Sequence, residues 1–150
     1  MEETKQGSLT LATELRAEIK KALPGPQKSR VLVLDDDEAI SMVVTEALEM
    51  AGLECRACST TSEGEKLLAS FEPHAILLDY RIPESGAKAF VDSAAAKPFK
   101  QSIILVSATE SIETVTRDLG LSAFLRKPFS IDQLYETLSR TLGVELQEAV

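Results

Sequence analysis

Short apolar runs alternate with longer segments of helical periodicity from Arg30 onward. The apolar runs lie at residues 31–34, 75–78 and 103–106, with shorter ones around residues 53–57 and 123–125. Continuous apolar strands are typical of a parallel sheet covered on both faces, and parallel strands need a crossover connection, usually a helix. The alternation therefore predicts an α/β fold: an open, right-handed, doubly wound sheet of five parallel strands with five helices.

Capping signals bound the first and the last of these helices. We expect the first to begin after an N-cap at Asp37 and to stop at Gly52. The last is expected to open with a capping box of Ser130 and Gln133 and to run to Gly143.

The three middle helices are less sharply bounded. The second follows one of two overlapping capping boxes, at residues 60–63 or 62–65. The third is expected to start after Gly86 and to end before Pro98. The fourth, at residues 109–119, has few apolar anchors and many β-branched residues, so it is the weakest of the five on propensity.

The chain length of 150 residues fits one domain. We expect that domain at residues 30–143, with an N-terminal helix and linker at residues 1–29 before it and a tail at residues 144–150 after it.

The N-terminal segment carries a narrow apolar stripe. Leu11, Leu15 and Ile19 recur at helical spacing, and the pattern stops at the Pro-Gly-Pro of residues 24–26. Such a stripe must lie against another surface, either this domain or a second chain. We favour a homodimer contact between two such helices, because the linker separates the segment from the domain.

Charge and hydropathy exclude several classes of partner. The net charge is −8, and the acidic excess lies entirely within residues 31–150. An acidic surface repels nucleic-acid phosphates and anionic membranes, so we expect neither as a partner. Apolar runs do not exceed four residues, and the first residues lack the basic-then-apolar order of a secretory signal. We therefore expect a cytoplasmic protein.

Polar side chains follow four of the five predicted strands. Asp35 and Asp36 follow the first strand, Asp79 closes the third, Ser107 the fourth and Lys127 the fifth. In an open α/β sheet these ends share one edge, and ligands bind where the strand order reverses. With the strand order 2-1-3-4-5, the first and third strands are neighbours, so the three carboxylates converge.

Converging carboxylates repel one another unless a cation shares them. A hard divalent ion with oxygen ligands fits, and Mg²⁺ keeps several waters at a site with two or three carboxylates. A carboxylate beside Mg²⁺ can accept a phosphoryl group. The ion, the Lys127 ammonium and the Ser107 hydroxyl would then each neutralise one phosphoryl oxygen.

At these residues the chain resembles the receiver domain of two-component response regulators, in particular the chemotaxis regulators. The matching stretches cover residues 30 to about 143 in order and spacing; they are VLVLDDDEAI, HAILLDYRIP, SIILVSA and AFLRKPF. The resemblance implies a flavodoxin-like fold with the same five-stranded sheet.

The resemblance also implies roles for the acidic residues. Asp79 would accept phosphate, and Asp36 and Asp79 would bind Mg²⁺ together with the backbone carbonyl of Arg81. Asp35 would act through water. Arg81 and Thr109, each two residues beyond a site residue, would tune the lifetime of the phosphoryl group.

Further roles follow for the later motifs. Lys127 and Ser107 would bind the phosphoryl oxygens, Ser107 and Phe124 would form the switch, and the Lys127-Pro128 bond would be cis. The sequence departs from the family in one place, because Gly86 stands seven residues after the phosphoacceptor, where the family more often has its loop glycine at the eighth.

These roles imply a phosphorylation-dependent signalling receiver of a phosphorelay rather than a turnover enzyme. It would promote its own phosphorylation at Asp79 and its slow dephosphorylation. A sensor histidine kinase or a phosphotransfer protein would donate the phosphoryl group, and a downstream protein would read the fourth helix, fifth strand and fifth helix. The sequence leaves open the kinase, the target, the pathway, and whether the chain is a stand-alone regulator or the end of a hybrid kinase.

Two other functions compete with this one. A receiver-like interaction domain could keep the fold without being regulated by phosphorylation. A haloacid-dehalogenase-like phosphatase would use Asp35 and Asp37 as its D-x-D motif, but Ala39 stands where that motif continues with Thr or Val, and Asp79 would have no role.

The cysteines and the histidine have structural interpretations. Cys55 and Cys58 form a C-x-x-C spacing, but a strand places residues three apart on opposite faces, which argues against a redox pair. His74 is the only histidine, so one chain cannot complete a four-ligand zinc site, and His74 is expected to begin the third strand.

Overall fold

A computed structural model describes residues 28–147 of the chain. Its centre is a five-stranded parallel sheet in the order β2-β1-β3-β4-β5, as the sequence predicts. The strands are β1 (Arg30–Leu34), β2 (Glu54–Cys58), β3 (Ala75–Asp79), β4 (Ile103–Ser107) and β5 (Ala123–Arg126). β3 and β4 are buried along their whole length, as a central strand with both faces covered must be.

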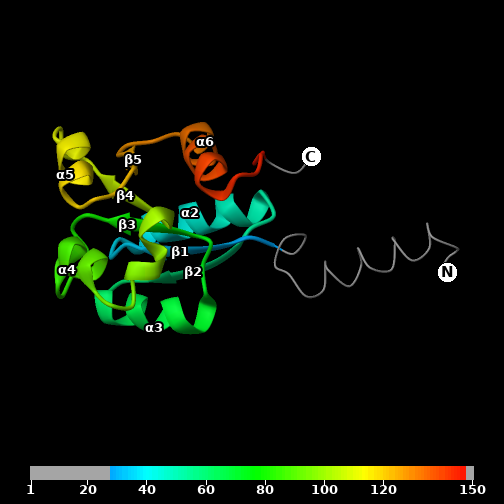
Figure 1. Cartoon of the computed structure of the whole chain (residues 1–150). Coiled ribbons are helices and arrows are strands. Elements are labelled where there is room, and N and C mark those ends of the chain that lie inside the picture. The colour runs from blue at the N-terminus through cyan, green and yellow to red at the C-terminus, as the bar shows by residue number, and fades with distance from the viewer. Residues whose placement is uncertain (1–27, 148–150) are drawn as a thin grey trace, which may run out of the picture.

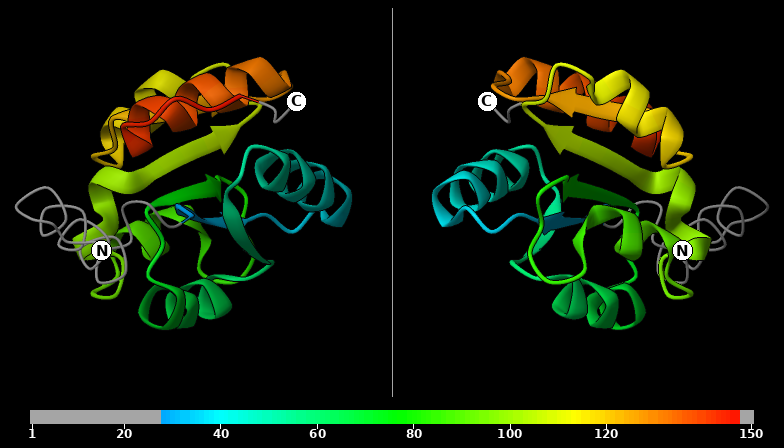
Figure 2. Two further views of the ribbon diagram at one scale, coloured as in Figure 1. Left: turned by 90° about the vertical axis from the view of Figure 1, so that its right-hand side faces the viewer. Right: turned by 90° about the vertical axis from the view of Figure 1, so that its left-hand side faces the viewer.

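Helices cover both faces of the sheet (Figures 1 and 2). On one face, α2 (Glu38–Met50) and α6 (Ile131–Leu142) contribute to a core with Val33, Leu77 and Val106. On the other face, α3 (Thr61–Phe71), α4 (Gly86–Asp92) and α5 (Ile112–Asp118) pack against Leu34 and Leu78. Successive strand residues alternate between the two cores, so the predicted doubly wound architecture is confirmed.

The predicted ends of α2 and α6 are confirmed. Asp37 Oδ1 accepts hydrogen bonds from the backbone N–H of Ala39 and of Ile40, so it caps α2. Ser130 and Gln133 form the reciprocal capping box of α6, and Gly143 ends that helix in the left-handed conformation with φ 71°.

Helix α3 uses the first of its two candidate capping boxes, because Thr60 Oγ1 accepts the N–H of Glu63 at 3.3 Å. Inside the helix, Gly64 is required by close packing against β1. A Cβ at this position would lie 2.5 Å from Leu34 Cδ2 and 3.1 Å from Phe90 Cε1. A side chain at residue 64 would therefore require the Leu34 and Phe90 side chains to shift.

The third predicted helix is wrong beyond residue 92. α4 ends at Asp92, residues 94–96 form turns, and a 3₁₀ helix, η1 (Lys97–Ser102), follows with Pro98 in its first turn. The physical reason is Ser93, whose hydroxyl donates to the carbonyl of Phe90 at 2.7 Å and accepts the N–H of Ala96 at 3.1 Å. A short polar side chain thus replaces the helical hydrogen bonds, which the run of alanines does not reveal.

The fourth predicted helix is shorter than residues 109–119. α5 begins at Ile112, and Thr109 lies in the preceding loop. Thr109 Oγ1 accepts the N–H of Ser111 at 3.4 Å, so a local side-chain contact competes with helix formation there.

Cys55 and Cys58 pack against opposite faces of the sheet, as strand alternation predicts, and both are free thiols. Burial raises the pKa of Cys55 to about 12 and that of Cys58 to about 11, so both are protonated at neutral pH. His74 immediately precedes β3, and its Nδ1 accepts the N–H of Arg30 at 2.9 Å. It joins the starts of β1 and β3.

The predicted N-terminal helix with Leu11, Leu15 and Ile19 lies outside the described residues. Between residues 28 and 147, no helix combines the length and the apolar character that a membrane span requires.

Candidate functional site

The polar side chains singled out in the sequence gather at one edge of the sheet. Asp35 and Asp36 follow β1, Asp79 ends β3 and Ser107 ends β4, while Lys127 directly follows β5. β1 and β3 are paired neighbours, and β3 is in turn paired with β4. The parallel register therefore brings strand ends far apart in the sequence to the same edge.

Three carboxylates form a cluster that can hold a cation. Asp35, Asp36 and Asp79 each offer an oxygen atom, and these atoms lie within 4.8 Å of one another. Asp35 and Asp79 are only 6% and 7% exposed, whereas Asp36 is open to solvent. A set of carboxylate oxygens with one open side suits a hard divalent ion such as Mg²⁺ that keeps part of its water shell.

Electrostatics at Asp79 favour the approach of a cation. Burial raises the pKa of the Asp79 carboxyl, and the neighbouring charge of Asp35 raises it further. The Lys127 ammonium acts in the opposite direction. The surroundings therefore make the ionised form of Asp79 less stable, and a bound cation would stabilise that form.

Lys127 already touches two of the three carboxylates. Its Nζ lies 3.2 Å from Asp35 Oδ2 and 3.6 Å from Asp79 Oδ1, and its side chain is mostly buried. The peptide bond from Lys127 to Pro128 is cis. Asp35 is held at its other oxygen as well, because the N–H of Asp37 donates to Oδ1 at 2.9 Å. Asp35 is thus fixed in place, while Asp36 is not.

The remaining predicted residues lie on strands β4 and β5 and on the loops that follow β3 and β4. The N–H of Arg81 donates to Asp79 Oδ1 at 3.4 Å, and the Arg81 side chain is exposed. Ser107 Oγ accepts the N–H of Thr109 at 3.1 Å, so these two residues are linked. Phe124 is half-buried and packs against the core on the α3–α5 face of the sheet.

Two contacts of these loops were missed by sequence reasoning. Glu84 has φ 77°, unusual for a side-chain-bearing residue, and its Oε1 accepts the N–H of Ser62 at 3.0 Å at the start of α3. Arg126 donates to the carbonyl oxygen of Thr109 at 2.9 Å. The charged Arg126 next to Lys127 was the available signal; nothing in the pattern around Glu84 indicates its partner.

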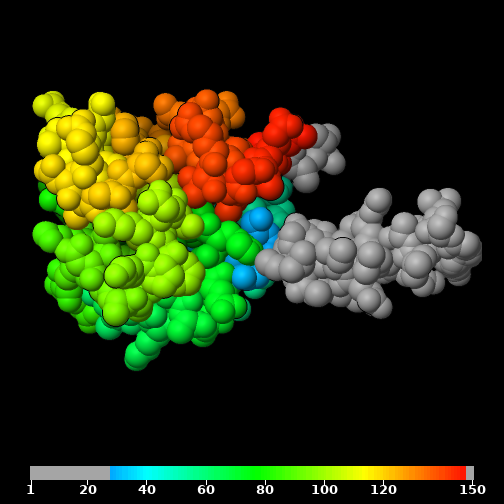
Figure 3. Space-filling model, viewed as in Figure 1, coloured from blue at the N-terminus to red at the C-terminus, as the bar shows by residue number. Residues whose placement is uncertain are grey.

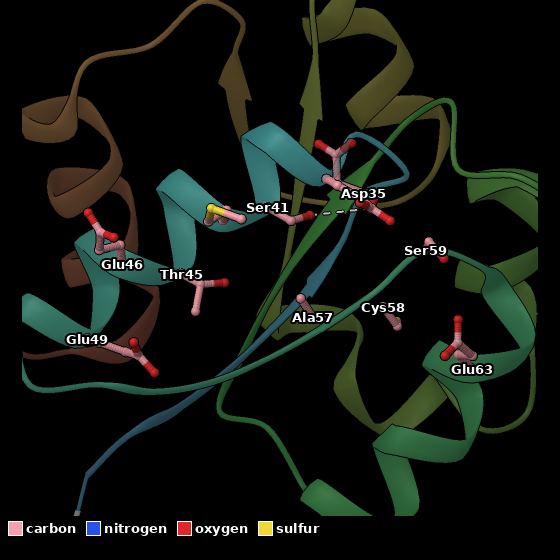
Figure 4. A pocket seen from close by; sticks show the side chains of 11 residues that line it. Asp35, Ser41, Thr45, Glu46, Glu49, Ala57, Cys58, Ser59 and Glu63 are labelled. Carbon is pink, nitrogen blue, oxygen red and sulfur yellow. Dashed lines mark hydrogen bonds between the residues drawn. The ribbon is translucent and has the colours of Figure 1, made fainter.

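Two grooves border the site. An acidic groove of about 530 Å³ runs from Asp35 between α2 and the β2–α3 segment, and Figure 4 shows its side chains and the bond from the Ser41 hydroxyl to the Asp35 carbonyl. Its acidic lining residues are Asp35, Glu38, Glu46, Glu49 and Glu63. An apolar groove of about 550 Å³ lies beside Lys127, lined by Ile40, Val43, Pro128 and Phe129 among others.

The family model described as the response regulator receiver domain matches residues 31–139. The chain is 30% identical over 119 residues to the DNA-binding transcriptional regulator NtrC of Escherichia coli K12, covering 78% of this chain and 25% of that protein. It is 28% identical over 120 residues to the regulatory protein AtoC of the same organism, covering 78% of this chain and 26% of that protein.

A solved structure is similar as well. The receiver domain protein from Methanospirillum hungatei JF-1, described as CheY-like, is 26% identical with a TM-score of 0.69, and the match covers 78% of this chain and 95% of that one. The chain spans about a quarter of the length of the two curated relatives.

Proposed function

This chain belongs to the response regulator receiver domain family of two-component systems, and on that premise we propose that Asp79 accepts a phosphoryl group with Mg²⁺ and thereby switches a protein-binding surface. The observation that carries the proposal is the convergence of Asp35, Asp36 and Asp79 with the Lys127 ammonium at one edge of the sheet. A structural role alone does not explain three clustered carboxylates, two of them buried.

In the proposed reaction, a carboxylate oxygen of Asp79 forms a bond to phosphorus as the phosphorus–nitrogen bond of a phosphohistidine breaks. The imidazole leaves with the electron pair of that bond. Asp36, Asp79 and the carbonyl of Arg81 would hold Mg²⁺, with Asp35 acting through water. The ion would neutralise charge on the phosphoryl oxygens.

Lys127 and Ser107 support the transfer from the other side. The Lys127 ammonium lies within 3.6 Å of Asp79 Oδ1, so it is close enough to bind an oxygen of a group attached there. The Ser107 hydroxyl ends the neighbouring strand and would donate to another oxygen. Arg81 and Thr109 border the acceptor and would set how readily water reaches the acyl phosphate.

The phosphodonor is proposed to be a sensor histidine kinase or a phosphotransfer protein. The apolar groove beside Lys127 offers a docking surface next to the acceptor, and Val43 on α2, which lines it, is 62% exposed. The adjoining acidic groove favours a basic donor surface. The family typically works in the cytoplasm, and we propose the same for this chain.

The output is proposed to be a protein contact. Phosphorylation would draw the Ser107 hydroxyl toward the phosphoryl group, and Phe124 would turn into the vacated space. The surface of α5, β5 and α6 would change with it; α5 and α6 lie side by side at the surface in the space-filling view (Figure 3). The relatives NtrC and AtoC extend far beyond the matched region, so this proposal concerns the receiver alone.

The proposal treats the chain as a signalling receiver and not as a turnover enzyme. It would catalyse its own phosphorylation at Asp79 and the slow hydrolysis of the resulting aspartyl phosphate.

We further propose that the N-terminal segment with Leu11, Leu15 and Ile19 pairs two copies of the chain. Leu15→Glu would then convert a dimer to a monomer in light scattering, and an unchanged mass would contradict this role.

The direct test of phosphate uptake is intact-mass measurement of the full chain with acetyl phosphate and MgCl₂. We expect one added phosphoryl group that requires Mg²⁺, none in Asp79→Asn, and a normal gain in the matched control Asp118→Asn, which alters an exposed aspartate on α5. Full phosphorylation of Asp79→Asn would overturn the assignment of the acceptor. No uptake by any variant would favour an interaction domain that phosphorylation does not regulate.

A further inference from the structure

A single arginine ties the loop between β4 and α5 to the neighbouring strand. Arg126 is the last residue of β5 and stands opposite Ser107 in the parallel register. Its Nη1 donates to the carbonyl oxygen of Thr109 at 2.9 Å and to that of Glu110 at 3.3 Å. The guanidinium therefore closes the loop that leads from Ser107 to the start of α5.

The two carbonyl contacts carry most of this interaction. Both bonds lie at an exposed position, and hydrogen bonds from a charged donor are stronger than neutral ones. A third contact, from Nη2 to Glu113 Oε1 at 3.8 Å, joins side chains that are 42% and 68% exposed. Ion pairs as exposed as this one contribute little, so the loop backbone is the main partner of Arg126.

The loop depends on this contact because α5 anchors it poorly. Ser111, the N-cap residue of α5, makes no side-chain capping bond. The helix has only seven residues, of which Ile112 and Thr116 are buried. A helix this short has little stability of its own, so the position of its first turn is decided by tertiary contacts.

The hydrogen bonds of Arg126 are also linked to Ser107 through Thr109. The N–H of Thr109 donates to Ser107 Oγ, while the carbonyl of the same Thr109 accepts from Arg126. Movement of the Ser107 hydroxyl toward Asp79 therefore pulls on a residue that Arg126 holds from the other side. The cost of that movement includes the strain or loss of the two carbonyl contacts.

We propose that Arg126 is a positioning residue that restrains the loop of residues 108–111 and slows the uptake of phosphate at Asp79. The inference rests on the proposed function of Asp79, and it adds a residue outside the acceptor site. Weakening the hydrogen bonds of Arg126 to the loop lowers the free energy needed to move Ser107. The population in which the Ser107 hydroxyl reaches the phosphoryl oxygens then rises.

The test compares Arg126→Met, Arg126→Lys and a matched control, Arg117→Met, which alters an exposed arginine on α5, all in the full chain. The first measurement is amide exchange at residues 109–113 without any phosphodonor. The methionine keeps the apolar stem of the side chain and removes both carbonyl contacts. We expect about three- to tenfold faster exchange in Arg126→Met, a smaller increase in Arg126→Lys and none in the control.

The second measurement is the rate of phosphorylation by acetyl phosphate with Mg²⁺ over a range of donor concentrations. We expect the maximal rate of Arg126→Met to rise about three- to tenfold with little change in the half-saturating concentration, although its melting temperature falls. A merely structural residue would lower both rate and stability. Unchanged exchange, or a rate that stays level or falls, would overturn the role of Arg126.

The two measurements separate this inference from the proposed function. If the unmodified chain takes up no phosphate, the function of Asp79 fails, while the exchange experiment still decides whether Arg126 holds the loop. If the unmodified chain is phosphorylated and Arg126→Met behaves like Arg117→Met in both measurements, the inference about Arg126 fails and the function of Asp79 stands.

Discussion

Helices α2 and α5 both begin at the edge of the sheet that carries the site, but they are held in different ways. α2 has thirteen residues, a side-chain cap from Asp37 and three buried residues, Val44, Ala47 and Leu48. α5 has seven residues, no side-chain cap and two buried residues. The loop that leads into it is held by Arg126, the last residue of β5.

The difference corresponds to the two tasks of the site. Asp35 precedes α2 and is held by the N–H of Asp37 and by Lys127, and this fixed position favours cation binding. Ser107 and Thr109 precede α5, where a weakly held segment can change position at low cost. One site can thus combine a firmly capped half that binds and a weakly anchored half that responds.

The largest expected effect tests the packing of the two helices. Leu48→Ala should lower the free energy of unfolding by about 2–5 kcal/mol, since Leu48 is fully buried in the core beneath α2. Ile112 is equally buried, but because α5 is short, Ile112→Ala should first increase the local opening of α5 rather than lower the global stability. Urea unfolding combined with amide exchange of residues 112–118 would measure both. Global destabilisation by both variants with no local opening of α5 would contradict the comparison.

A phosphoryl mimic should move the two halves unequally. With beryllofluoride and Mg²⁺, we expect exchange at residues 109–125 to change by about 5- to 150-fold, as for a coupling of about 1–3 kcal/mol, while α2 changes little. The adaptable half responds because Ser107 would be drawn to the bound group. Changes confined to the neighbourhood of Asp79, with residues 109–125 silent, would show that the signal leaves by another face.

The helix caps provide a smaller, matched test. Asp37→Ala removes two hydrogen bonds at the start of α2 and should cost about 1 kcal/mol of stability. Ser111→Ala, at the corresponding position of α5, removes no capping bond and should change stability by less than about 0.5 kcal/mol. Thermal unfolding of both variants checks this. Equal losses would mean that α5 is capped in solution.

The smallest expected effect concerns His74, which joins the starts of β1 and β3 by accepting the N–H of Arg30. Burial lowers the pKa of His74 from its ordinary value of 6.5, and the nearby Arg30 lowers it further. The unfolded chain therefore binds a proton more readily, so stability should decline as the pH falls below about 6.5 and level off below the folded pKa. His74→Asn keeps an acceptor for the N–H of Arg30 and should remove this part of the pH dependence. An unaltered pH dependence in that variant would exclude His74 as its source.

Most of the fold follows from local signals. The apolar runs predicted all five strands, and Asp37, Ser130 and Gln133 predicted helix ends, because a cap acts over three or four residues. The third helix was overextended because one hydroxyl, that of Ser93, competes with the helical bonds of its neighbours. Propensity alone does not weigh such a competition, since the same serine can also face solvent.

The candidate site likewise has features that local sequence predicts and features that it does not. Residue types at strand ends, together with the parallel order of the strands, were sufficient to predict that Asp35, Asp36 and Asp79 converge. The pairing of Lys127 with both Asp35 and Asp79 depends on the side-chain conformation reached after the sheet has formed. Period and spacing contain no information about that conformation.

The sequence by itself determined which segments become strands and helices and which polar residues stand at their ends, because those signals are carried by residues close together in the chain. Only the tertiary structure decided that Glu84 bonds the start of α3 and that Arg126 holds the loop before α5. These contacts join residues 22 and 17 positions apart. They form between elements already packed on the sheet, so their partners are chosen by geometry in space and not by order along the chain.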